Sequence, residues 1–459
     1  MFVSESERNL LVQHKDTIDI LRHRDIPDVK QLSNMAQISW ITAKKHVNVL
    51  EEAVIIKQSN MGINLNNDFG FFASIAIGGT QVKATLIDFS FRPVNIFKHS
   101  LFKAYFDSLV SLFPDTKIDT AKEQILCCKT TRSFAFVQNI CSSFIDRTIS
   151  FFEKTDTARL LGIGISLPGL IDWEHNIINF CPNFPELDGC ALSTLIKNSV
   201  HEEILSHNVL VQFSHDTTAA LLYEKERLYL PEINYRSYKD APNVACLYMG
   251  SGLGASFILQ NRLLNGANYC VGEIGHWSIP LDEKRFEKII KDYQASGNKT
   301  AIEDIEHYKF QEVLEPNKNL SDRKCNCGQD YCLENAIRIK VFNSNDNNDF
   351  LSKTNPTELE HFAEMHPYRY DLLKCFISQI LNVLINTLNC NIVILTGRIL
   401  TCINDLGDEI EGLKMCSALK FPSNRCHIIM GSKRPDGTAI GAGIITYHYL
   451  IGNGLNIQW

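Results

Sequence analysis

The sequence lacks the features of a membrane-spanning or exported protein. No run of about 18 uninterrupted apolar residues occurs among its 459 residues, so no transmembrane helix is predicted. The opening stretch MFVSESERNL also lacks the basic-then-apolar order of a signal peptide. These absences predict a cytoplasmic protein with no membrane insertion.

An excess of positive charge is absent as well. The formal net charge is −7 at pH 7, from 45 Lys and Arg residues against 52 Asp and Glu residues. This argues against a globally basic nucleic-acid binder but says nothing about a small basic patch. The length exceeds what one simple core needs, so two or three domains are expected.

Three of the 15 cysteines fall within the short stretch CNCGQDYCLE, as Cys325, Cys327 and Cys332. A reducing compartment makes such a cluster more typical of a metal site than of disulfides, and thiolates suit Zn²⁺ in a tetrahedral set. The alternative is a buried loop of reduced cysteines. A fourth ligand is needed, and the spacing does not choose between His276 and His307.

Residues 1–68 are expected to form a winged helix-turn-helix domain. Apolar spacing predicts helical structure between Ser4 and Arg24, then a short helix near Val29–Met35. A second helix follows Ser39, which is a good N-cap. The stretches VIIKQ and INLN predict the two strands of a wing, joined by a turn that contains turn-forming residues.

The helix after Ser39 is interpreted as the recognition helix, with Ile41, Val47 and Leu50 facing the core. Its candidate DNA contacts are Ser39, Thr42, Lys44 and Lys45, and His46 is also expected to face outward. Such helices reach base edges in the major groove, while lysines contact phosphates. The alternative is a generic three-helix interaction module, because acidic and basic residues balance in this segment.

Glycine-rich turns recur at the ends of predicted strands from Phe71 onward. FFASIAIGGTQVKATLID predicts two strands around Gly78, Gly79 and Thr80, a turn that lets backbone approach a phosphate. NVACLYMGSGLGASFIL and CNIVILTGRIL predict further strands with glycine loops, and Asp216 marks a strand-to-helix junction. The pattern predicts an α/β fold with two lobes around a cleft and ligands held at the loops.

These motifs resemble the ROK family of repressors, open reading frames and sugar kinases. The resemblance covers nearly the whole chain and is most specific at GEIGH, residues 272–276, and at CNCGQDYCLE. It implies an actin-like, ribonuclease-H-type, two-lobed sugar-binding domain over residues 69–459. It also implies Zn²⁺ bound by His276 with Cys325, Cys327 and Cys332, which favours His276 over His307.

A sugar site is implied by the same resemblance. The sugar-contacting residues carried over are Asn183, Asp216, Glu273, His276 and Glu334. Zinc is then structural, because it fixes the loop that presents His276 and Glu334 to the sugar. The family's N-D-x-N motif reads HDTT at residues 215–218, so both asparagines are replaced, although His215 could still bond a hydroxyl.

Kinase members read D-x-G-G-T where this chain has AIGGT, with Ala76 in place of the aspartate. That aspartate organises Mg²⁺ beside the ATP phosphates, and alanine cannot do so. The resemblance therefore implies the repressor branch: a sugar-responsive, DNA-binding regulator of carbohydrate metabolism, not an enzyme, with Asp216 as a vestigial base. Its implied partners are operator DNA, a sugar or phosphosugar, and further copies in a homodimer or dimer of dimers.

Two other hypotheses remain open. One is an active ATP-dependent sugar kinase with an accessory DNA-binding domain, since Asp216 is present. The other is a regulator controlled by a protein partner. The long charged segment 281–324, inserted between His276 and Cys325, could supply its surface, although a solvated loop insertion is the simpler interpretation.

Overall fold

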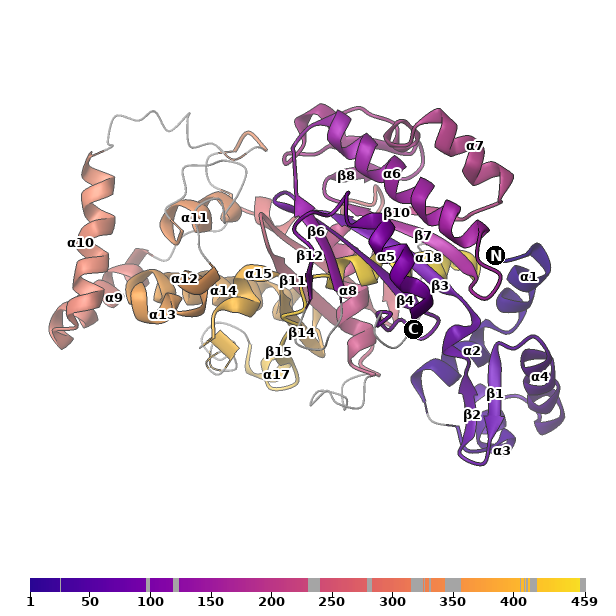
Figure 1. The fold of residues 1–459 in the computed structure, drawn as a ribbon. Coiled ribbons are helices and arrows are strands. Elements are labelled where there is room, and N and C mark those ends of the chain that lie inside the picture. Colours follow the sequence, from indigo (N-terminus) through magenta and orange to yellow (C-terminus); the bar gives the residue numbers. More distant parts are fainter. Residues whose placement is uncertain are drawn as a thin grey trace. The chain divides into compact units, whose positions relative to one another are not determined.

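The computed structural model describes most of the chain, and it divides into two compact units (Figure 1). The first unit holds residues 1–233 and 436–458, and the second holds 234–435. The described residues are 1–24, 26–95, 100–118, 124–229, 240–278, 283–314, 325, 327–329, 332–342, 356–404, 406–407, 409, 412 and 419–454. Each unit contains its own sheet flanked by helices, which confirms the α/β class.

The N-terminal segment of the first unit contains four helices and a hairpin. These elements are α1 (Glu5–Gln13), α2 (Lys15–His23), α3 (Val29–Ala36), α4 (Trp40–Glu52), β1 (Ile56–Ser59) and β2 (Gly62–Leu65). Side-chain caps begin three of the helices: Ser4 bonds Glu7 N, Asp28 bonds Gln31 N and Ser39 bonds Thr42 N. Such caps satisfy backbone N–H groups that the helix leaves unpaired, so local sequence determines where these helices begin.

Two expectations for α4 were wrong. Ile41 does not face the core but is 64% exposed, because Ala43 occupies the core position one turn before the buried Val47. Residues 43, 47 and 50 share one face of a helix, and residue 41 lies on the opposite face. His46 is half-buried instead of facing outward: its Nδ1 lies 3.0 Å from the Thr17 hydroxyl.

Charged contacts join the N-terminal segment to the rest of the first unit. The Arg22 guanidinium is buried over the rings of Phe91 and Tyr447, at 4.2 and 4.0 Å from their centroids. Asp19 accepts hydrogen bonds from both Arg22 and the Tyr447 hydroxyl, at 2.8 and 2.7 Å. A buried charge needs such partners, so these residues fix α2 against the C-terminal helix.

The first sheet has the order β10-β7-β3-β4-β6-β5. Its strands are β3 (Phe71–Ile77), β4 (Gln81–Asp88), β5 (Lys117–Ile118), β6 (Gln124–Lys129), β7 (Leu160–Leu167) and β10 (Val211–His215), with a separate hairpin β8 (Leu170–Asp172) and β9 (Ile177–Phe180). The strands β3, β7 and β10 run parallel, while β4, β6 and β5 pair antiparallel. The parallel part brings the ends of β7 and β10 to one edge.

Helices cover both faces of this sheet. They are α5 (Lys103–Leu109), α6 (Phe134–Glu153), α7 (Asn198–Ser206), α8 (Asp216–Arg227) and α18 (Gly437–Leu450). Successive β3 residues point to opposite faces, so Phe71 meets Phe102 beside α5, while Phe72 meets Tyr447 of α18. Helix α18 is rich in small residues and packs between the sheet and α8.

The second sheet has the order β13-β12-β11-β14-β15. Its strands are β11 (Val244–Met249), β12 (Leu253–Leu259), β13 (Arg262–Leu263), β14 (Ile392–Thr396) and β15 (His427–Met430). The helices of this unit are α9 (Glu283–Ser296), α10 (Lys299–Leu314), α11 (Leu333–Lys340), α12 (Pro356–Glu360), α13 (Phe362–Met365), α14 (Pro367–Leu388), α15 (Arg398–Cys402) and α17 (Lys420–Ser423). Side chains from β11, β12, β14 and α14 form its core.

Among the described residues, α14 is the one helix that is long and apolar enough to cross a membrane by length and composition. Most of that span is buried inside the unit, and residues such as Phe376 and Leu381 belong to its core. A core helix and a membrane span share these properties, so burial explains the apolar composition of α14.

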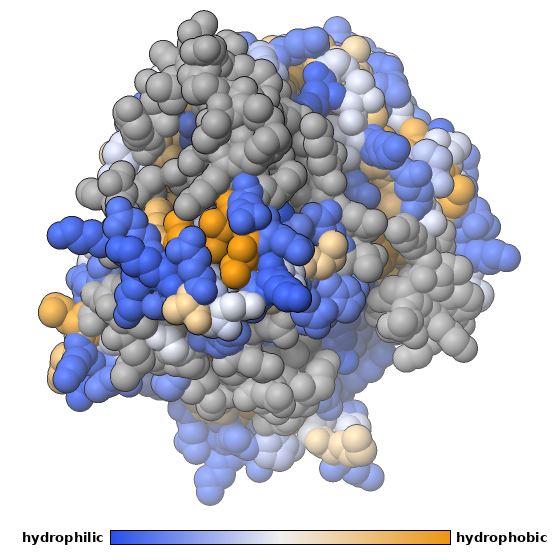
Figure 2. Space-filling view, turned by 90° about the vertical axis from the view of Figure 1, so that its left-hand side faces the viewer, coloured by the Kyte–Doolittle hydropathy of each residue, from blue (hydrophilic) through white to orange (hydrophobic). Residues whose placement is uncertain are grey.

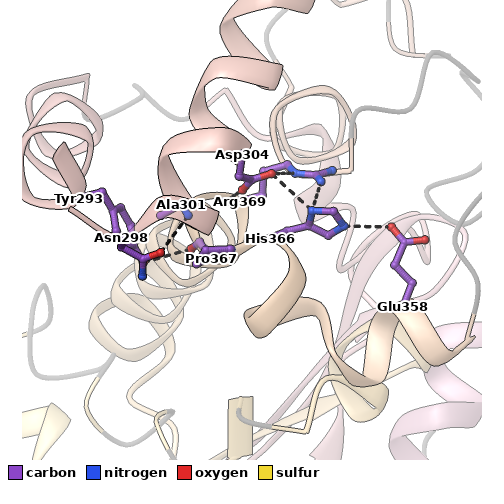
Figure 3. A network of polar contacts seen from close by, with 8 residues as sticks. All are labelled: Tyr293, Asn298, Ala301, Asp304, Glu358, His366, Pro367 and Arg369. Atoms are coloured by element: carbon purple, nitrogen blue, oxygen red, sulfur yellow. Dashed lines mark hydrogen bonds and ion pairs between the residues drawn. The ribbon is translucent and has the colours of Figure 1, made fainter. Parts of the chain in front are cut away.

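The predicted insertion forms two helices, and the second is anchored to the unit's core helix. In Figure 3, Asp304 of α10 faces Arg369 and His366 at the start of α14, and His366 reaches Glu358 of α12. Burial would raise the pKa of Asp304, but the bonds from His366 and Arg369 lower it below its ordinary value. The helical part is therefore docked, whereas residues 281–282 and 315–324 lie outside the described residues.

Figure 2 shows the side of the molecule to which α9 and α10 belong. Hydrophilic residues predominate on its described surface, and a small apolar area lies among them. Partly buried apolar side chains of α9, including Phe286 and Ile289, pack against the unit's core. The apolar residues of α9 thus serve mainly to attach the helical pair.

Candidate metal centre and ligand sites

Four potential metal ligands come together in the second unit. The ligand atoms of His276, Cys325, Cys327 and Cys332 all lie within 4.8 Å of one another. His276 ends a short 3-10 helix, η6 (Ile274–His276), and Cys332 is the N-cap of α11. The Leu333 N–H donates to the carbonyl of Trp277 at 2.9 Å, which ties the two segments together beside the cluster.

The glycines of GEIGH allow the chain to pass close to β12. Gly272 has φ +102°, and a Cβ there would lie 1.7 Å from the carbonyl oxygen of Ala255. A Cβ on Gly275 would lie 2.4 Å from the carbonyl oxygen of Leu253. No other residue fits these positions without moving the backbone. The motif therefore places His276 by backbone packing before any ion binds.

Two contacts, one at each ring nitrogen, orient the imidazole of His276. Its Nδ1 lies 3.5 Å from the sulfur of Cys325, and its Nε2 lies 3.7 Å from a carboxylate oxygen of Glu273. The contact with Cys325 raises the pKa of His276 to about 9, against the opposing effect of burial. Metal-binding histidines commonly direct the second nitrogen at a carboxylate, which fixes the ring.

The residues present fit Zn²⁺. A tetrahedral zinc ion with metal–sulfur bonds of about 2.3 Å holds its sulfurs roughly 4 Å apart, within the spread of this cluster. Three soft thiolates and one imidazole form one of the common structural ligand sets. The side chain of His307, the other candidate ligand, lies outside the described residues.

Glu334 connects the cluster to the glycine loop between β11 and β12. Its Oε2 accepts a hydrogen bond of 2.8 Å from the Leu253 N–H, and a Cβ on Gly252 would lie 3.0 Å from the same oxygen. Burial raises the pKa of Glu334, while the bond from Leu253 and the charge of His276 lower it. Glu334 and Glu273 both act on or contact His276 and supply two oxygen acceptors beside the cluster.

The other predicted sugar contacts lie in the first unit. Asp216 begins α8 directly after β10, as expected, and Asn183 is half-buried in the loop before a 3-10 helix, η3 (Pro185–Leu187). Both act on the thiol of Cys181: burial raises its pKa to about 12, a hydrogen bond from the Asn183 backbone lowers it, and the Asp216 charge raises it. The backbone of Asn183 therefore contacts this thiol, and the charge of Asp216 acts on the same group.

Asp216 lies in a buried environment that favours its protonated form. Burial raises its pKa, and the charge of His215 and the Thr217 N–H oppose this effect. The Thr217 N–H donates a hydrogen bond of 2.7 Å to the Asp216 carboxylate. His215 and Thr217, within the altered HDTT motif, bond to each other at 2.8 Å through Nδ1 and the hydroxyl. His215, at a position where the family has asparagine, thus forms a hydrogen bond within the chain.

The phosphate-type turn Gly78-Gly79-Thr80 connects β3 to β4, as expected. Its carbonyl oxygens are occupied by groups that follow β6: the Thr130 hydroxyl donates to Gly78 at 2.7 Å, and Arg132 Nε donates to Gly79 at 3.1 Å. Ala76 is 8% exposed and cannot replace the missing carboxylate. Sequence inspection missed Arg132, because only the tertiary fold brings it to this turn.

The predicted DNA contacts are the N-cap Ser39 and three residues in the first half of α4, and they differ in how exposed and how engaged they are. Lys44 and Lys45 are exposed, and the Lys44 ammonium lies 5.1 Å from the ring centroid of Trp40. Ser39 and Thr42 bond to each other and cap the helix. Trp40 is 50% exposed and was missed by the sequence reasoning, although its place directly after the N-cap could have indicated it.

Comparison with known proteins agrees with this architecture. The model of the ROK family matches residues 117–448. The xylose repressor of Staphylococcus xylosus is 34% identical over 147 residues, which is 31% of this chain and 34% of that protein. An N-acetyl-D-glucosamine kinase of Pectobacterium carotovorum is 25% identical over 180 residues, 39% of this chain and 44% of that protein. The chain thus spans less than half the length of these relatives.

Solved structures are similar over a longer range. A ROK family transcriptional regulator, described as a homolog of the E. coli MLC protein, has a TM-score of 0.62 at 17% identity and covers 98% of both chains. A ROK family glucokinase from Streptomyces griseus has a TM-score of 0.50 at 15% identity and covers 82% of this chain and 99% of its own. At such low identity these likenesses show the fold alone.

Proposed function

This chain belongs to the ROK family, and we propose that it is a sugar-responsive, DNA-binding repressor of carbohydrate metabolism. One observation carries the proposal: a helix-turn-helix with two exposed lysines on α4 shares the first unit with Asp216. The likeness to a ROK transcriptional regulator over 98% of the chain and the similarity to xylose repressors support it. Such regulators bind operators through paired heads, so a homodimer or dimer of dimers is part of the proposal.

The proposed effector is a sugar or phosphosugar. Its proposed contacts are Asn183, Asp216, Glu273, His276 and Glu334. These groups offer the acceptors and donors that a polyhydroxylated ligand requires. The proposed role of Zn²⁺ is structural: bound by His276 and the three cysteines, it would hold the segment bearing Glu334 in place.

Within the first unit, α8 connects Asp216, a proposed effector contact, to the N-terminal segment. Helix α8 begins at Asp216 and ends one residue after Glu226, whose carboxylate lies 3.1 Å from the ring of His23 on α2. A change at the start of a rigid helix can alter its other end, and this end contacts the N-terminal segment. A sugar that binds the two arrangements of α8 with different affinity would shift their populations.

Sugar kinase activity is the second candidate. The raised pKa of Asp216 and the similarity to N-acetyl-D-glucosamine kinases favour it. Ala76 opposes it, because phosphoryl transfer depends on a positioned Mg²⁺ beside the phosphates. Regulation by a protein partner would use the docked helices α9 and α10 as its surface.

Thermal unfolding of the purified protein against a panel of sugars and phosphosugars, each with and without Mg-ATP, tests the proposal. We expect one sugar class to raise the melting temperature without Mg-ATP, and Asp216→Asn to abolish the rise. The matched control is Glu202→Gln, which changes an exposed carboxylate of α7 and should leave the rise intact. A rise that requires Mg-ATP would instead support the kinase, and no rise with any sugar would support a protein partner.

A further inference from the structure

An apolar residue, Ile41, lies on the exposed face of α4 in the first turn of the helix. Ile41 is 64% exposed, and the helix buries Ala43, Val47 and Leu50 on the opposite side. The neighbouring positions on the exposed face are taken by Trp40, Lys44, Lys45 and Asn48. A single exposed isoleucine is not unusual by itself, but here it lies among polar and cationic groups in the first turn of the helix.

The polar side chains of that first turn are already engaged. Ser39 Oγ accepts the Thr42 N–H at 3.0 Å and lies 2.8 Å from the Thr42 hydroxyl. The Ser39 hydroxyl thus serves as the N-cap, and the two hydroxyls are paired with each other. Ile41 and Trp40 are the exposed apolar side chains of this turn.

The charge around Ile41 favours a polyanion. Lys44 and Lys45 lie one turn further along the same face, and α4 has no acidic residue until Glu51 and Glu52 in its last turn. The N-terminus of a helix carries partial positive charge, which adds to the attraction. The Lys44 ammonium over the Trp40 ring places a cation beside Ile41 without covering it.

We propose that Ile41 reads the C5-methyl group of a thymine in the major groove, so that each operator half-site contains an A·T pair at that position. The inference rests on the proposed DNA-binding function and adds a specificity to it. Thymine is the base that offers an apolar group in the major groove, and a branched aliphatic side chain is its natural contact. Lys44 and Lys45 bind the flanking phosphates and position the helix.

The test uses operator DNA selected from a random pool with the full-length protein. Each thymine of the half-site is then replaced by deoxyuridine, which removes one methyl group and keeps base pairing. We expect one replacement to weaken binding about fourfold per half-site, the effect of losing one buried methyl contact. Ile41→Ala should bind the thymine and deoxyuridine operators equally.

Two control proteins separate the possible outcomes. Val49→Ala changes another exposed apolar residue of α4 and should keep the full thymine preference. Lys44→Ala combined with Lys45→Ala should weaken both operators equally and flatten the salt dependence of binding. Selection of no sequence at all would refute the proposed function. Tight binding with no methyl effect at any thymine, or an effect that survives Ile41→Ala, would overturn the inference about Ile41 alone and leave this face for a protein partner.

Discussion

The two units use glycine turns in opposite ways. In the second unit, Gly272 and Gly275 let the chain approach β12 so closely that His276 is held beside three cysteine sulfurs and two carboxylates. In the first unit, the Gly78-Gly79 turn has its carbonyl oxygens bonded by Thr130 and Arg132. One turn brings potential metal ligands together, whereas the other is engaged by the chain's own side chains.

The two units also differ in where their buried polar groups lie. The first unit has lost the phosphate-loop carboxylate at Ala76, but it buries Arg22 and His448 where the N-terminal segment meets α18. The second unit gathers four potential metal ligands in the cysteine cluster and has a separate polar network around Asp304. The buried charges of the first unit connect α2 to α18 and α8.

Removal of one thiolate should give the largest effect. Cys327→Ser leaves three ligands, and a structural zinc site of this type contributes about 10–16 kcal/mol of binding free energy at neutral pH. We expect bound zinc to fall from one equivalent per chain to near zero, and the second unit to lose protection from hydrogen exchange around α11. Elemental analysis and hydrogen–deuterium exchange measure the two effects.

The matched control for that variant is Cys270→Ser, an exposed cysteine of the same unit that lies outside the cluster. It should keep zinc and exchange protection. The first unit should be unchanged in both variants, which sharpens the contrast between the units. Full zinc retention in Cys327→Ser would show that the cluster is not the metal site.

Local patterns explain what the sequence could predict. The three cysteines of CNCGQDYCLE are close in sequence, so their meeting required no knowledge of the fold, and the caps of α3 and α4 depend on residues three positions apart. The strand–turn–strand pattern around Gly78 was equally local. Each of these features arises from bonds within a single turn or hairpin.

Contacts between distant segments explain what could not be predicted. Helical spacing placed Ile41 in the core with Val47 and Leu50, but the small Ala43 takes that position in α4, which packs against α3. The choice of His276 over His307 rested on resemblance to a family, since no local spacing joins either one to Cys325. The docking of Asp304 on Arg369 likewise brings together residues with no sequence pattern in common.

A loss of stability of intermediate size is expected where α2 contacts the rest of the first unit. Asp19→Ala removes the carboxylate partner of Arg22 and leaves the guanidinium buried at 3% exposure. Breaking a buried ion pair in this way costs about 3–5 kcal/mol, and partial exposure of Asp19 places this case near 3 kcal/mol. The loss should appear as faster hydrogen exchange in α1–α4, with α11 and the zinc content unchanged.

Asp16→Ala serves as the control, because Asp16 lies on the same helix but is exposed. Its loss should cost less than about 1 kcal/mol, through the helix dipole alone. Equal effects of the two substitutions would mean that the buried charges do not hold the N-terminal segment.

The smallest expected effect concerns His448, which is buried in α18 near Asp19, Glu226, Arg22 and His23. Burial lowers its pKa from about 6.5 to about 4, so the unfolded chain binds a proton at higher pH than the folded chain does. Stability from this group is complete above pH 6.5 and is lost as the pH falls toward 4, by at most about 3 kcal/mol. His448→Gln should flatten this part of the pH profile of unfolding, whereas His361→Gln, an exposed histidine of the second unit, should not.

Asp88, whose pKa burial raises to about 6, titrates in the same range with the opposite sign, but it does so equally in every variant and cancels from the difference. An unchanged slope in His448→Gln would show that water reaches this residue, and that the junction between α2 and α18 is more open than its buried charges indicate.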